Sequence, residues 1–113
     1  MVKTITTEEV KKNLDDKKAF LLLDVLASNS FEGRHIPGAK SVPYGTSFLE
    51  DFEKAISVPK DKEIVVYCAS NGCQLSVLAA NALDEAGYSN VSHFVDGLAG
   101  WMQAGYDFES ETT

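Results

Sequence analysis

The sequence contains little cysteine, a single arginine and no long apolar run. Two cysteines among 113 residues are too few for the disulfide scaffold of a small secreted domain. No apolar stretch approaches the roughly 20 residues that a membrane-spanning helix needs. The chain does not begin with basic residues followed by an apolar run, which is the pattern of a leader peptide. These absences predict a cytoplasmic protein that is neither exported nor bound to a membrane.

An excess of positive charge is also lacking. Lysine and arginine total 10 against 17 aspartates and glutamates, which gives a net charge of −7. Nucleic acids and anionic membrane surfaces are bound mainly through clustered basic residues, so neither is an expected partner. With 44% hydrophobic residues the chain can fill one core. Its length predicts a single domain over residues 1–113, with 109–113 as a frayed tail.

Three apolar runs predict strands. The run "AFLLLDV" contains Asp24 near its end, and "EIVVY" ends directly before Cys68. Continuous apolar runs of this kind are typical of strands that are buried on both faces of a parallel sheet. The segment "VSHFV" is expected to form one more strand.

Helix-start signals stand between these strands. Two capping boxes, Thr6-x-x-Glu9 and Ser47-x-x-Glu50, each predict the beginning of a helix. Asp96 can cap a last short helix that bears large apolar residues.

The longest helical pattern begins at Leu75. Its apolar positions recur at the spacing of a helix packed on one face, and Gly87 is expected to end it in a left-handed conformation. These positions are Leu75, Leu78, Ala79, Ala82, Leu83 and Ala86. Because strands and helices alternate, the sequence predicts an α/β fold with a mainly parallel sheet.

Cys68 stands where a predicted strand gives way to this helix. Ligands of such sheets bind at the carboxyl ends of the strands. Asn71 and Gly72 accept positive φ, so backbone N–H groups between Ala69 and Gln74 can converge on an anion. Thiol pKa values fall from about 8.5 into the range of about 3.5–7.5 at helix N-termini. The position favours a thiolate nucleophile, with an inert buried cysteine as the alternative.

Four segments, in order, resemble the single-domain rhodaneses, a family of sulfurtransferases. They are "LLLDV", "FEGRHIPGAKSVP", "IVVYC" and "SVLAANALDEAGYSNVSHFVDGLAGWMQAG". The resemblance implies a mainly parallel sheet with helices on both faces, and a persulfide on Cys68 that forms without a metal or organic cofactor. It implies a small sulfur donor and a thiol, cyanide or protein acceptor as partners. The substrate-binding loop would consist of Ala69, Ser70, Asn71, Gly72, Cys73 and Gln74.

This loop departs from the pattern of many rhodaneses. Their loop resembles Cys-x-x-Gly-x-Arg-Ser, whose arginine helps to hold an anionic donor such as thiosulfate. The stretch "CASNGCQLS" has no basic residue and is longer before Ser76. Thiosulfate is therefore expected to be a poor donor, and a weakly catalytic or non-catalytic sulfur-carrier module remains open.

Cys73 has two interpretations. It can resolve a persulfide or sulfenate on Cys68 by forming a disulfide with it. It can also simply fill the space between the loop and the helix. A disulfide requires Cα atoms roughly 4.4–6.8 Å apart, and the sequence leaves this distance open.

Two charged residues outside the loop are further candidates. Arg34 is the only arginine and lies beside the "HIPGA" turn, where it can supply the positive charge that the loop lacks. It can equally be a solvated residue or a partner of Asp24 or Glu32. Asp24 is expected to have a structural role near the site.

Other enzyme chemistry is disfavoured. His35 and His93 do not have the paired spacing of a zinc site, and His93 is expected at a half-buried position of its strand. Cysteine phosphatases and arsenate reductases require Cys-x5-Arg, because an arginine fork holds the oxyanion. Gln74 stands at the sixth position after Cys68, which argues against that class.

Overall fold

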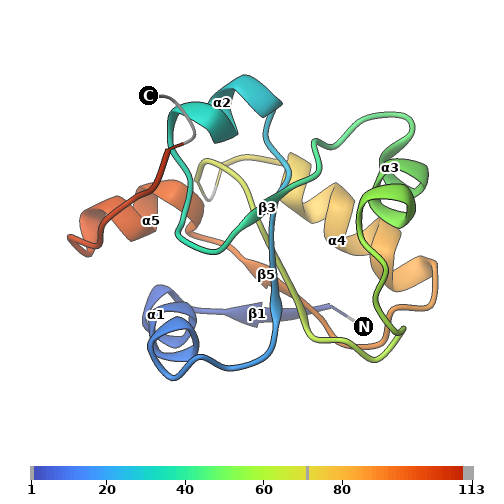
Figure 1. Cartoon of the computed structure of the whole chain (residues 1–113), viewed down its shortest axis with the longest axis horizontal. Helices are drawn as coiled ribbons and strands as arrows, with labels where there is room; N and C mark the ends of the chain where they lie inside the picture. The colour runs from blue at the N-terminus through green and yellow to red at the C-terminus, as the bar shows by residue number, and fades with distance from the viewer. Residues whose placement is uncertain (1, 71, 111–113) are drawn as a thin grey trace.

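A parallel sheet forms the centre of the structure, which is a computed structural model that describes residues 2–70 and 72–110 (Figure 1). Within these residues the sheet has five strands in the order β1-β5-β4-β2-β3, and each pairs in parallel with its neighbours. The strands are β1 (Lys3–Ile5), β2 (Leu21–Asp24), β3 (Lys40–Ser41), β4 (Ile64–Tyr67) and β5 (Val91–Phe94). The predicted α/β fold and parallel sheet are confirmed.

Helices cover both faces of this sheet (Figure 1). Residues of α3 and α4 pack with one set of strand side chains, and residues of α1, α2 and α5 pack with the other set. The helices are α1 (Thr7–Asp15), α2 (Ser28–Gly33), α3 (Phe48–Ala55), α4 (Leu75–Glu85) and α5 (Gly97–Gln103). None of the helices in the described part of the chain is long and apolar enough to cross a membrane.

The central strand β4 explains the continuous apolar runs. Ile64 and Val66 pack in the core that lies under α3 and α4. Val65 and Tyr67 pack in the core on the opposite face. Because successive side chains of a strand point to opposite faces, a strand covered on both sides has to be apolar throughout. The next residue, Cys68, returns to the core under α3 and α4.

The first predicted capping box is confirmed and the second is wrong. The Glu9 N–H donates to the Thr6 hydroxyl at 3.1 Å, and the Thr6 N–H donates to the Glu9 carboxylate at 3.0 Å. The helix α3 does begin after Ser47, but the Ser47 side chain makes no capping bond. With φ −106° and ψ 23°, its backbone is not in the extended conformation from which a capping side chain reaches the helix N–H groups.

At the other helix ends, too, some predictions are confirmed and others are wrong. Gly87 has φ +99°, so the predicted left-handed stop of α4 is confirmed. Asp96 precedes α5 with helical backbone angles and makes no side-chain cap, so that prediction is wrong. Leu78 was expected on the packed face of α4, but its side chain is 46% exposed.

The end of the chain also differs from the expectation. Glu109 was placed in a frayed tail, but it exchanges both backbone hydrogen bonds with His35, each at 2.9 Å. This bridge fastens the segment after α5 to the turn that follows α2. Residues 111–113 lie outside the described residues.

Candidate active site

Cys68 lies directly after β4, at the carboxyl end of the central strand, and is 1% exposed. The first backbone N–H groups of α5 hold this point: the Leu98 N–H donates to the Cys68 carbonyl at 3.0 Å, and the Ala99 N–H donates to the Ala69 carbonyl at 2.8 Å. Gly97 has φ +58°, and a Cβ added there would collide with the Cys68 carbonyl oxygen. The start of the loop is therefore fixed by a close backbone approach that only glycine permits.

The structure joins Cys68 and Cys73 as a disulfide, with their Cα atoms 6.4 Å apart. Cys73 comes just before Gln74, the residue that precedes α4, and its N–H donates to the Ser70 carbonyl at 3.1 Å. The two cysteines of the chain thus meet in one loop. The resolving role of Cys73 stays a prediction.

Two side chains that the sequence analysis did not assign to the site lie next to the Cys68 sulfur. The Ser76 hydroxyl lies 3.1 Å from Cys68 Sγ and 2.7 Å from His93 Nε2. Ser76 is buried in the first turn of α4, and His93 lies on β5 at the half-buried position that the sequence predicted. Burial lowers the pKa of His93, which favours the neutral imidazole at neutral pH.

Part of this arrangement follows because the side chains of β5 point alternately to the two faces of the sheet. Val91 belongs to the core under α3 and α4, so His93, two residues later, points toward the same helices. Nothing in the sequence fixes which turn of α4 lies opposite His93. The pairing of Ser76 with His93 is therefore a tertiary feature that sequence reasoning missed.

The remaining loop residues are accessible. Ala69, Gly72 and Gln74 are exposed, and Ser70 and Cys73 are partly buried. Asn71 lies outside the described residues, and with it part of the predicted anion-binding backbone.

At the neighbouring strand end, polar side chains hold backbone. Asp24 is fully buried, and its carboxylate accepts the Leu26 N–H at 2.9 Å. Burial raises the pKa of Asp24, partly opposed by the bond from the Leu26 N–H. The Tyr67 hydroxyl accepts the Ile36 N–H at 3.2 Å, and burial raises the pKa of this phenol as well. The structural role of Asp24 near the site stays a prediction.

Arg34 and His35 contact other parts of the molecule. The guanidinium carbon of Arg34 lies 4.8 Å from the centre of the Phe108 ring. His35 is buried, stacks on Phe31 at 3.9 Å between ring centres, and its Nδ1 lies 2.8 Å from the Phe31 carbonyl oxygen. In the described part of the chain, the side chains of Arg34 and His35 interact with residues outside the Cys68 loop, and the predicted anion contact of Arg34 stays a prediction.

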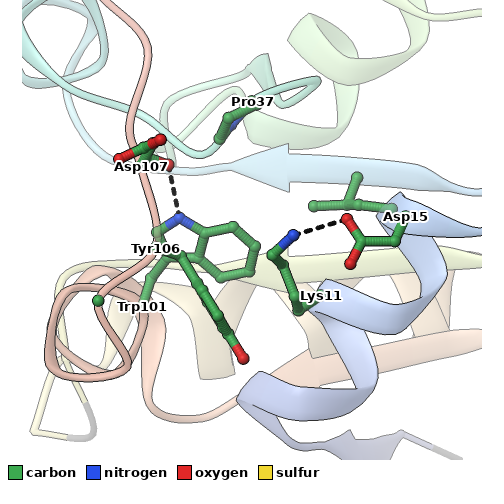
Figure 2. A pocket seen from close by; sticks show the side chains of 8 residues that line it. Lys11, Asp15, Pro37, Trp101, Tyr106 and Asp107 are labelled. Carbon is green, nitrogen blue, oxygen red and sulfur yellow. Dashed lines mark hydrogen bonds and ion pairs between the residues drawn. The ribbon is translucent and has the colours of Figure 1, made fainter.

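The described residues form several surface hollows, and two of them bear on where a ligand could bind. The larger, of about 470 Å³, lies between α1 and the segment after α5, away from Cys68. Figure 2 shows that its polar groups bond to one another: Lys11 pairs with Asp15 at 2.6 Å, and the Trp101 indole N–H donates to the Asp107 carbonyl at 2.8 Å. A smaller hollow, of about 170 Å³, has Ser70 of the loop in its wall. Among residues 2–70 and 72–110, no three His, Cys, Asp or Glu side chains gather so as to hold a metal ion.

Comparison with known proteins gives a consistent result. The model of the rhodanese-like domain matches residues 6–104. Over 100 residues the chain is 31% identical to the "Probable adenylyltransferase/sulfurtransferase MoeZ" of Mycobacterium tuberculosis, which covers 88% of this chain and 24% of the relative. It is 29% identical to a sulfurtransferase of Allochromatium vinosum, over 93% of this chain and 92% of the relative.

A solved structure is also similar. The crystal structure of the thiosulfate sulfurtransferase from Pseudomonas aeruginosa matches with a TM-score of 0.83 and 26% identity, over 99% of this chain and 21% of that one. The chain thus spans about a quarter of the Mycobacterium relative and about a fifth of the Pseudomonas chain. On the match over residues 6–104, the chain belongs to the family of rhodanese-like domains.

Proposed function

We propose that the protein is a sulfurtransferase that moves sulfane sulfur from a donor to a thiophilic acceptor through a persulfide on Cys68. The observation that carries the proposal is the position of the Cys68 sulfur, 3.1 Å from the hydroxyl of Ser76 in the first turn of α4. The positive end of a helix and a hydroxyl donor both favour a thiolate. The names of the relatives support sulfur transfer as the class of reaction.

The chemistry has three steps. A reducing thiol first opens the Cys68–Cys73 disulfide and is itself oxidised. The Cys68 thiolate then attacks the sulfane sulfur of the donor: a new sulfur–sulfur bond forms on Cys68, and the rest of the donor leaves with the electron pair of the broken bond. Finally the acceptor attacks the outer sulfur, and Cys68 leaves as a thiolate.

A second candidate is a sulfur carrier that loads Cys68 but turns over weakly. The loop has no basic residue, and the arginine of the chain packs on Phe108. When the Cys68 thiolate attacks an anionic donor such as thiosulfate, the loop offers backbone N–H groups and a helix end, but no basic side chain, to bind the charge. Uncharged or weakly charged sulfane donors are the better class of substrate for this loop.

The test combines loading with turnover. The reduced protein is treated with polysulfide or thiosulfate, and the mass of the tryptic peptide that contains Cys68 is measured before and after cyanide is added. We expect one added sulfur on Cys68, its removal by cyanide as thiocyanate, and loss of both in Cys68→Ser. Cys73→Ser is the comparison variant and is expected to load once.

The outcomes separate the two candidates. Loading without repeated thiocyanate release supports the carrier. Undiminished thiocyanate release by Cys68→Ser would contradict both candidates, because each needs the Cys68 sulfur.

A further inference from the structure

Three side chains from three different elements form one line of hydrogen bonds that ends at the reactive sulfur. Cys68 follows β4, Ser76 lies in the first turn of α4 and His93 lies on β5. The two links measure 3.1 Å, from Sγ to the hydroxyl oxygen, and 2.7 Å, from that oxygen to Nε2. Cys68 and Ser76 are each 1% exposed, so Ser76 connects a buried sulfur to a half-buried imidazole.

The direction of these bonds depends on the state of the sulfur. In the disulfide, Cys68 Sγ carries no hydrogen, so the Ser76 hydroxyl is the donor to it and the Nε2–H of His93 is the donor to Ser76. In the reduced protein a Cys68 thiol can donate to Ser76, which then donates to an unprotonated Nε2. The same three side chains therefore serve both states by reversing their donors and acceptors.

We propose that Ser76 and His93 form a proton relay for Cys68. When the thiol becomes a nucleophile, its proton passes to the Ser76 oxygen as the Ser76 hydroxyl proton passes to His93 Nε2. One S–H and one O–H bond break, one O–H and one N–H bond form, and a thiolate and an imidazolium result without any change of oxidation state. Ser76 is then a catalytic residue, because it touches the reacting sulfur, and His93 is a positioning residue that acts through it.

In the described part of the chain, the residues that lie beside His93 on the neighbouring strands do not ionise. The residues in register with His93 are Thr4 on β1 and Val66 on β4, and α4 has no acidic residue in its first turn. Two other ionisable side chains, Asp24 and Tyr67, lie in register with each other at the neighbouring strand ends, and Tyr67 packs in the core on the other face of the sheet. Burial lowers the pKa of His93, so its imidazole is neutral near pH 7 and one of its two ring nitrogens carries no hydrogen.

The inference rests on the proposed role of Cys68 as the nucleophile, but it is tested without sulfur transfer. The background is Cys73→Ser, in which Cys68 is the single thiol, and the rate of alkylation by iodoacetamide is measured against pH. Ser76→Ala and His93→Gln are each expected to raise the apparent pKa of Cys68 by about one unit, which slows alkylation at neutral pH about tenfold. Glutamine retains a hydrogen-bonding side chain but cannot take up the proton.

The matched control is Ser92→Ala, which removes a buried serine next to His93 on β5. Because neighbouring residues of a strand face opposite sides, this variant is expected to leave the pH profile unchanged. A second measurement follows the His93 ring by NMR. Two groups joined by a relay titrate as a coupled pair, so Cys68→Ser should shift the His93 titration.

Alkylation profiles of Ser76→Ala and His93→Gln that coincide with the background would overturn the relay. Should either variant fail to fold by circular dichroism, the NMR titration decides: a His93 titration that is identical with and without the Cys68 thiol also overturns it. If the profiles shift as expected while Cys68→Ser still transfers sulfur, the relay stands and the proposed function fails.

Discussion

The carboxyl ends of β2 and β4 are neighbours in the sheet, and their polar side chains do different work. Asp24 is in register with Tyr67. At this level both side chains accept backbone N–H groups, from Leu26 and Ile36, and so hold the turns that follow. One residue further on, Cys68 contacts Ser76 instead.

A single step along β4 separates these two roles. Tyr67 packs under α1, α2 and α5, whereas Cys68 packs under α3 and α4. On the first face, Asp24 and Tyr67 each accept one backbone N–H group. On the second, the line of hydrogen bonds ends on His93, an ionisable side chain whose pKa burial lowers. In this chain, the face of the strand end therefore separates the side chains that hold backbone from the cysteine that we propose as the nucleophile.

The largest expected effect comes from breaking the backbone contact between the start of α5 and the Cys68 carbonyl group. Gly97→Ala places a Cβ against the Cys68 carbonyl at a φ of +58°. The left-handed conformation alone costs about 1–3 kcal/mol for a residue with a side chain, which corresponds to a fall of more than about 5 °C in Tm. We expect this loss in thermal unfolding, together with slower alkylation of Cys68.

Gly33→Ala is the matched control. Gly33 ends α2, and a Cβ there would meet no atom within 4 Å. Alanine also has the higher helix propensity, so Tm should be unchanged or slightly raised. Equal losses of Tm in the two variants would show that the close approach of α5 to Cys68 contributes no more to stability than the end of α2 does.

The next effect concerns the fate of an oxidised Cys68. In Cys73→Ser the first transfer from donor to Cys68 should remain nearly intact, because the attacking sulfur is unchanged. Under peroxide the sulfenate of Cys68 then has no neighbouring thiol with which to form a disulfide, and it should proceed several-fold faster to sulfinic acid. Mass spectrometry of the Cys68 peptide measures this. Equal over-oxidation of the parent and the variant would reduce Cys73 to a packing residue.

Much of the fold could be predicted because its signals are local or periodic. The apolar runs located β2 and β4, and the Thr6 capping box and Gly87 marked helix ends correctly. Three short elements, β1, α2 and β3, were missed, since they have only 3, 6 and 2 residues. Segments this short are fixed by their neighbours in the sheet and core and not by their own pattern.

The candidate site divides in the same way. A cysteine between a strand and a helix can be recognised from the order of the segments, so Cys68 and its loop could be predicted as the site, and this assignment stays a prediction. The contact of Ser76 with His93 depends on how far α4 slides along β5, which no spacing within either segment encodes. Ser47 shows the converse: its motif is present, but the local backbone angles do not let its side chain reach the helix.

The smallest expected effect tests the structural role of Asp24 at the carboxyl end of β2. Burial raises the pKa of Asp24, so the folded protein binds this proton more tightly than the unfolded chain does. The resulting contribution to the free energy of unfolding is fully present below the unfolded-state pKa of about 3.9 and is lost as the pH rises through the raised value. Asp24→Asn retains an oxygen that can accept the Leu26 N–H but cannot ionise. Urea unfolding at a series of pH values should show a smaller loss of stability toward neutral pH in the variant, on top of any constant offset from its amide.

Sulfur transfer should be unchanged, because Asp24 lies on the supporting side of the strand end. If Asp24→Asn instead slowed the alkylation of Cys68 as much as Ser76→Ala does, the division between the two strand ends would be wrong.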